Sequence, residues 1–175
     1  GELDKSEHYL QEGLSGARAF RDAELEATFL NNLGNLHASR GGYEAAVVDY
    51  AAAMEKAAAA DNFSIVATAC VNGGMALTQR KSHKEAALLF DRAHHVLRGL
   101  EPDYYTAYGF INLGLGYGEL AARLPDQHSH LPSKAFDALS RALDIASDNN
   151  DYRTASYAFG YLGTLYERER RYEEA

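Results

Sequence analysis

The sequence predicts an all-α protein built as an array of antiparallel helix hairpins. Two observations carry this prediction: a repeat of about forty residues, and apolar side chains at helical spacing within each copy. The composition agrees, because the 175 residues include 15 Gly, 12 Tyr and 7 Phe but 3 Pro and no Trp. Gly41-Gly42, Asp61-Asn62 and Asp148-Asn149-Asn150 mark helix ends. Helices are expected at 2–20, 24–40, 43–60, 63–80, 83–99, 103–122, 133–148 and 151–169.

The repeat is recognised by a glycine in the first helix of each hairpin. The four copies are Asn32-Leu33-Gly34, Asn72-Gly73-Gly74, Asn112-Leu113-Gly114 and Tyr161-Leu162-Gly163. The glycine lies on the apolar stripe, where it allows a neighbouring helix to approach closely. The second helix carries an alanine, an aromatic residue and another alanine, as in Ala46, Tyr50 and Ala53. We expect one array with these segments: 1–21, the second helix of a partial repeat; 22–61; 62–101; 102–150, with an inserted loop at 123–132; and 151–175, a partial repeat.

The pattern resembles the tetratricopeptide repeat. The residues that match it best are Leu30, Leu33, Gly34, Gly41, Tyr43, Ala46, Tyr50 and Ala53. The repeat length resembles the long-helix subgroup found in kinesin light chains, Gα-binding adaptor proteins and many bacterial regulatory proteins. The resemblance implies a right-handed superhelical solenoid of antiparallel hairpins, whose first helices line a concave groove for a protein or peptide. Tyr172–Ala175 matches the start of a further second helix, so we expect a fragment of a larger protein.

The predicted groove is polar and uncharged in its early part and aromatic in its later part. Asn32, Asn72 and Asn112 recur at one repeat position. Their amides could bind the backbone of an extended peptide, as the resemblance implies, or could join each hairpin to the preceding one. Both interpretations stay open at this point. The predicted peptide-binding residues are Thr28, Asn31, Asn32, Asn35, Asn72, Met75, Gln79, Tyr108, Asn112, Tyr157 and Tyr161.

Charge and cysteine content restrict the partners and the compartment. The formal net charge of -8 argues against nucleic acid or an anionic membrane as the principal partner. No Lys or Arg occupies the wall positions where chaperone adaptors of the family clamp a peptide carboxylate, so an acidic chaperone tail is not expected. The single cysteine, Cys70, is expected to be a buried small hydrophobe in a reducing compartment. We therefore expect a cytoplasmic protein with no membrane segment.

No arrangement of residues in the sequence indicates catalysis. The glycine-rich stretch Gly114–Gly118 falls inside a predicted helix, and no strand precedes it. His128 and His130 lie in the predicted insertion without an evident third metal ligand. We expect no enzyme activity, metal or cofactor, and a protein-interaction scaffold that binds a peptide or partner helix. One alternative is a regulatory or sensor segment of a larger bacterial enzyme or transcription regulator, and another is self-association through open solenoid ends, giving a homodimer.

Overall fold

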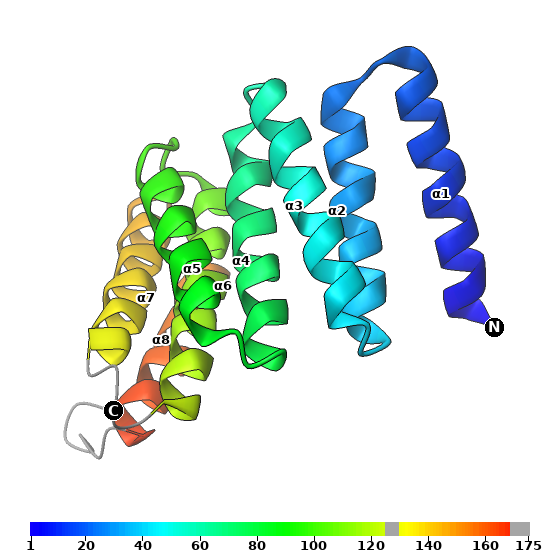
Figure 1. Cartoon of the computed structure of the whole chain (residues 1–175). Helices are drawn as coiled ribbons and strands as arrows, with labels where there is room; N and C mark the ends of the chain where they lie inside the picture. Colours follow the sequence, from blue (N-terminus) through cyan, green and yellow to red (C-terminus); the bar gives the residue numbers. More distant parts are fainter. Residues whose placement is uncertain (125–129, 169–175) are drawn as a thin grey trace. The chain divides into compact units, whose positions relative to one another are not determined.

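The computed structural model describes residues 1–124 and 130–168, and these residues form eight α-helices and no strand (Figure 1). The all-α prediction is confirmed. Most predicted helix ends agree with the observed ends to within a residue. The helices are α1 (Glu2–Phe20), α2 (Ala23–Ser39), α3 (Tyr43–Ala59), α4 (Phe63–Gln79), α5 (His83–Arg98), α6 (Tyr104–Arg123), α7 (His130–Asp148) and α8 (Tyr152–Arg168).

The predicted helix ends agree because the chain uses the same stop and start signals repeatedly. The side chains of Asp22, Asn62 and Asp103 each accept a hydrogen bond from a backbone N–H of the next helix, at 3.0, 3.1 and 2.8 Å. These bonds satisfy amides that have no partner within the helix. Five of the helices, α1 to α4 and α7, are followed by a left-handed residue, which turns the chain back on itself. The residues with positive φ are Arg21, Gly41, Asp61, Lys81 and Asn150.

The predicted inserted loop at 123–132 is too long, mainly at its second end. Helix α6 continues to Arg123, and α7 begins at His130 rather than at residue 133. Pro132 is compatible with this start because it lies in the first turn of α7, where a backbone N–H has no partner within the helix. Residues 125–129, which include His128, lie outside the described residues, as does the segment Tyr172–Ala175.

The chain divides into two compact units, Gly1–Val96 and Leu97–Ala175. In the first unit α1 packs on α2, α2 on α3, and α4 on both α2 and α3. In the second unit α6 packs on α7 and α8, and α7 also packs on α8. Within each unit the hairpins bring the first helices, α2 with α4 and α6 with α8, into contact. The predicted groove residues of each unit therefore lie on neighbouring first helices.

The repeat glycines lie where two helices are closest. A Cβ atom added to Gly34 would lie 2.6 Å from the Tyr50 ring, and one added to Gly74 would lie 2.5 Å from the Phe90 ring. In the second unit a Cβ on Gly114 would lie 2.6 Å from Leu139. These three partners are 0–3% exposed, so they are enclosed by their neighbours. The predicted role of the glycine, close approach of the second helix, is confirmed in both units.

Candidate functional site

Four polar side chains form a hydrogen-bond network between the hairpins of the first unit. The Asn72 side-chain amide on α4 donates to the Oδ1 atoms of Asn31 and Asn35 on α2, at 3.1 and 3.2 Å. The Tyr50 hydroxyl on α3 donates to the same Asn35 oxygen at 2.7 Å. Burial, with a smaller contribution from the Asp49 carboxylate, raises the pKa of Tyr50 to about 12. Asn72 thus makes the contacts expected of an asparagine that joins neighbouring hairpins.

The other two asparagines of the predicted ladder differ from Asn72. Asn32 is exposed and Asn112 is half-buried, and neither side chain has a hydrogen bond to any residue within 1–124 or 130–168. Each retains two amide donors and an acceptor for a partner. The three asparagines occupy equivalent positions in the sequence repeat, but their hydrogen bonding in the structure differs. Asn72 bonds within the protein, whereas Asn32 and Asn112 keep their hydrogen-bonding groups available.

The remaining predicted residues of the first unit are all half-buried. Thr28 is half-buried and bonds back to the Glu24 carbonyl of its own helix at 3.0 Å. Met75 and Gln79 on α4 are also half-buried. None of these side chains carries a formal charge. This part of the candidate site can offer hydrogen bonds and a small apolar contact, without strong electrostatic attraction.

The second unit has an exposed cluster of tyrosines, which we call the tyrosine surface. On α6 the Tyr104 ring stacks on Tyr108, with centroids 6.2 Å apart, and meets Tyr105 edge-on at 5.3 Å. The surface consists of these three residues together with Arg153 and Tyr157 on α8; its tyrosines are 45–75% exposed. Tyr161, the other aromatic residue predicted on this helix, is half-buried.

Arg153 links the two helices of the tyrosine surface. Its interactions with Tyr157 first, and then with Tyr104, raise the pKa of the guanidinium. Asp151, which caps α8, has its pKa lowered chiefly by hydrogen bonds from Thr154. Sequence reasoning did not include Arg153 or Tyr104. The available signal was their shared repeat position, ten residues before the glycines Gly163 and Gly114.

Rigid aromatic rings with hydroxyl groups, next to an arginine, are typical of protein-binding surfaces. Tyr and Arg are enriched at such interfaces because each offers both apolar area and directional hydrogen bonds. The four tyrosines of the tyrosine surface are exposed to solvent, whereas Phe90, Phe110 and Tyr117 are buried. An exposed cluster of this kind marks an interaction site more often than an isolated exposed ring does.

Among the described residues, no three His, Cys, Asp or Glu side chains form a group that could hold a metal ion, and none of the helices has the length and hydropathy of a membrane span. Cys70 is fully buried beside Met54, with the two sulfur atoms 3.2 Å apart. Burial raises the pKa of its thiol to about 11, so it stays protonated at neutral pH and packs as an apolar side chain.

Comparison with known proteins finds a solved structure with a similar fold. No protein-family model matches the chain, and no curated protein matches it in sequence. The solved structure of BtubC (BKLC) from P. vanneervenii is similar to it, with a TM-score of 0.57 and 18% sequence identity. The similarity covers 97% of this chain and 75% of BtubC. At this identity the comparison supports a shared all-α fold and does not transfer an activity.

Proposed function

We propose that this chain is a non-catalytic protein-interaction scaffold of the tetratricopeptide type, which binds a peptide or partner helix on its first helices. The observation that carries the proposal is the tyrosine surface, since it places exposed aromatic and hydrogen-bonding groups on two adjacent first helices. The forty-residue hairpin repeat and the likeness to BtubC support a right-handed solenoid architecture. The acidic net charge favours a protein partner in the cytoplasm over nucleic acid or membrane.

The asparagines extend this proposal toward recognition of a peptide backbone. In the second unit, the side chain of Asn112 can bond to the carbonyl and N–H groups of an extended partner without reading its side chains, and Asn32 offers the same groups in the first unit. The tyrosine surface then supplies most of the binding energy, because buried aromatic anchors dominate such interfaces. Asn72 holds the hairpins together instead, so its loss should act through stability.

Binding should depend on the tyrosine surface. The probe is a synthetic peptide chosen from a random phage-displayed library selected on the purified chain, titrated by calorimetry. Serine at both Tyr108 and Tyr157 should weaken its binding by roughly 30- to 1000-fold, because each buried aromatic anchor contributes about 1–2 kcal/mol. Tyr9→Ser is the matched control, since Tyr9 is 67% exposed but lies on α1 in the other unit. Asn112→Ala, in the same unit as the tyrosine surface, should weaken the same peptide while helix content and melting remain unchanged.

Two results would count against this function: a library that yields no binding peptide, or binding that the tyrosine and asparagine variants leave unchanged. Asn72→Ala serves as a separate comparison. It removes hydrogen bonds to Asn31 and Asn35, so it should lower the melting temperature whether or not a peptide is present.

A second candidate function is association through the exposed face of α8. Phe159 is 61% exposed, whereas Leu30, Cys70 and Phe110 at the same repeat position are 0–6% exposed. A Cβ on Gly160 would meet nothing within 4 Å. If this face joins two copies, light scattering should show a mass that rises with concentration, and Phe159→Glu should restore a monomer. A constant monomer mass at high concentration would contradict self-association and leave the peptide-binding proposal intact.

A further inference from the structure

The large hydrophobic residues that the second unit exposes are all aromatic, as far as the structure describes this unit. They are Tyr104, Tyr105, Tyr108, Tyr152, Tyr157 and Phe159. The first unit, in contrast, also exposes aliphatic side chains such as Leu25, Val48 and Leu88. An amphipathic helix docks its apolar face in a hydrophobic groove, whereas a segment in the polyproline II conformation docks on aromatic side chains. The composition of the exposed surface favours the second kind of ligand for this unit.

The spacing of side chains along α6 fits an extended ligand. Tyr104, Tyr108 and Asn112 recur every four residues, so they lie on one face of the helix. The centroids of the two rings are 6.2 Å apart, and a polyproline II segment advances by about 6.2 Å in two residues. A β-strand advances by about 6.6–6.8 Å in two residues, so the hydrogen-bonding groups must distinguish the two conformations.

The polar groups of the tyrosine surface suit a ligand that lacks backbone N–H groups. The hydroxyls of Tyr104, Tyr105 and Tyr108 have no hydrogen bond to any described residue and can donate, and Arg153 can only donate. A partner helix bonds its backbone groups internally, and a β-strand brings N–H groups that require acceptors. A polyproline II segment leaves its carbonyls without internal bonds, and proline has no N–H. Donors alone can therefore satisfy the backbone of a proline-rich segment.

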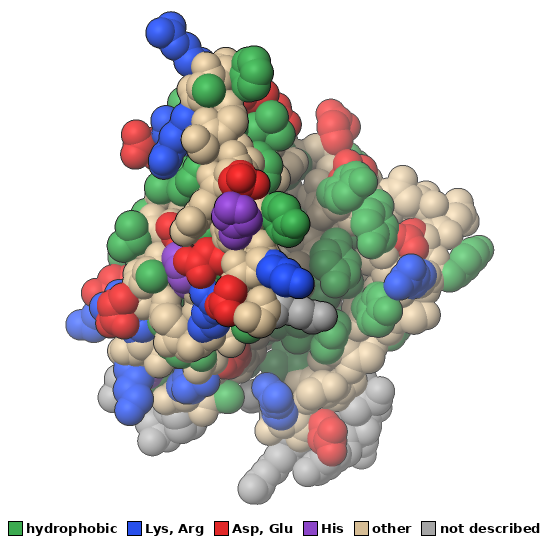
Figure 2. Space-filling model, turned by 90° about the vertical axis from the view of Figure 1, so that its right-hand side faces the viewer, with side chains coloured by type: hydrophobic (Ala, Val, Ile, Leu, Met, Phe, Trp, Pro, Cys, Tyr) green, Lys and Arg blue, Asp and Glu red, His purple; other side chains and the backbone are tan. Residues whose placement is uncertain are grey.

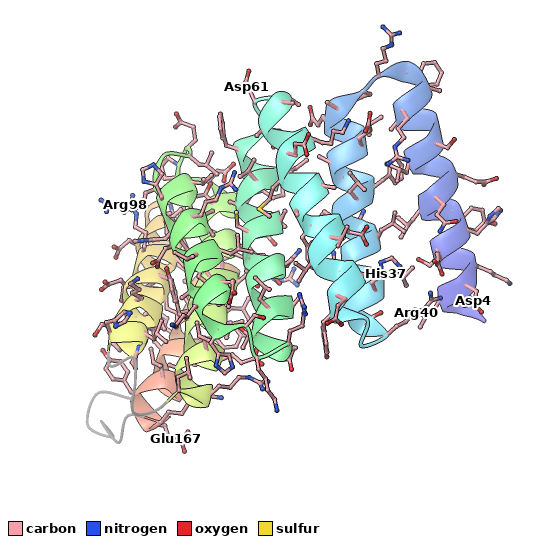
Figure 3. The ribbon with its side chains drawn as sticks, viewed as in Figure 1. Asp4, His37, Arg40, Asp61, Arg98 and Glu167 are labelled. Atoms are coloured by element: carbon pink, nitrogen blue, oxygen red, sulfur yellow. The ribbon has the colours of Figure 1, made fainter. Side chains whose placement is uncertain are left out.

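Arg153 also brings a charge that the protein leaves available. It forms no ion pair with an Asp or Glu among the described residues. In the first unit, by contrast, Arg40 pairs with both Asp4 and Glu7, and Figure 3 shows Asp4 and Arg40 at the same end of α1 and α2. Figure 2, which views the molecule from the α1 side, shows acidic, basic and histidine side chains close together there. The charge of Arg153 thus favours a ligand with an acidic side chain.

We propose that the tyrosine surface binds a proline-rich segment in the polyproline II conformation, with an acidic residue of that segment next to Arg153. This inference rests on the proposed function and names the chemical class of its peptide ligand. A proline-rich segment is already extended before it binds, so it loses less conformational entropy than a disordered chain that must fold into a helix. An exposed surface of four tyrosines then suffices for specific binding.

Calorimetric titration of the whole chain with synthetic peptides tests the ligand class. The probe is an end-capped peptide of about ten prolines with one central glutamate, and the comparison peptide has alternating alanine and serine in place of the prolines. The proline peptide should bind at least about tenfold more tightly, because only it is preformed and free of N–H groups. Tyr104→Ser/Tyr108→Ser should weaken its binding by about tenfold or more, whereas Tyr9→Ser, in the other unit, should leave it unchanged.

A third peptide, with glutamine in place of the glutamate, tests the contact with Arg153. The unaltered chain should prefer the glutamate peptide by about two- to fivefold at low ionic strength, and Arg153→Gln should abolish this preference. A preference that persists in Arg153→Gln would show that the acidic residue does not lie next to Arg153.

The inference is wrong if the proline peptide binds no more tightly than the alanine–serine peptide, or if Tyr104→Ser/Tyr108→Ser leaves its binding unchanged. The proposed function still stands in that case if the library-selected peptide binds and the serine variant at Tyr108 and Tyr157 weakens it. Both fail together only if no peptide depends on the tyrosine surface.

Discussion

Replacing Gly74 by alanine should destabilise the protein by about 2–3 kcal/mol, although alanine is the better helix former. The new methyl group would lie 2.5 Å from the Phe90 ring, which is 0% exposed and cannot move aside without disturbing the surrounding core. The melting temperature, measured by circular dichroism, should fall by about 5–10 °C. Gly34→Ala should behave similarly, because its methyl group would meet Tyr50.

Gly118→Ala is the matched control and should change stability in the opposite direction. Gly118 also lies inside a helix, but a Cβ there would meet nothing within 4 Å. Alanine at this position should therefore stabilise the protein by about 0.5–1 kcal/mol through helix propensity alone. If Gly74→Ala melted at or above the temperature of the unaltered chain, the close approach of α4 and α5 would not explain why glycine stands there.

These glycines show why so much of the fold could be predicted from the sequence. Close helix contacts require a small residue, and the repeat places one at the same offset in each hairpin. Asp and Asn caps then mark the helix starts. The prediction was wrong at the beginning of α7, where Pro132 suggested a loop boundary but a proline is equally compatible with the first turn of a helix.

The candidate site was less predictable because it depends on which helices are neighbours. A repeat position identifies Asn32, Asn72 and Asn112 as equivalent, but only Asn72 has Asn31 and Asn35 within hydrogen-bond distance. His37 occupies a position at which the repeat has a tyrosine, and its contacts with Asp49 and Glu7 come from two other helices. Spacing within one repeat carries no information about such pairings.

Stability should also depend on a buried carboxylate that joins the first three helices. Glu26 on α2 has a side chain only 8% exposed, and its Oε2 atom lies 2.9 Å from Nζ of Lys56 on α3 and 3.9 Å from Nε of Arg18 on α1. Lys56→Met removes the nearer cation and leaves the carboxylate desolvated. We expect a loss of about 1–3 kcal/mol in the free energy of unfolding, measured by urea denaturation, because the buried carboxylate keeps only the more distant Arg18 and its desolvation is no longer offset by a close cation.

The double variant Glu26→Gln/Lys56→Met separates this cause from lost packing of the lysine chain. Glutamine removes the buried charge while keeping the shape of the side chain, so the double variant should recover most of the stability that Lys56→Met loses. Arg80→Met gives the comparison for a solvent-exposed pair, since its partner Glu44 is 80% exposed, and should cost less than about 1 kcal/mol. If the double variant were as unstable as Lys56→Met, the loss of stability would come from the apolar contacts of the lysine side chain. The buried charge of Glu26 would then not be its cause.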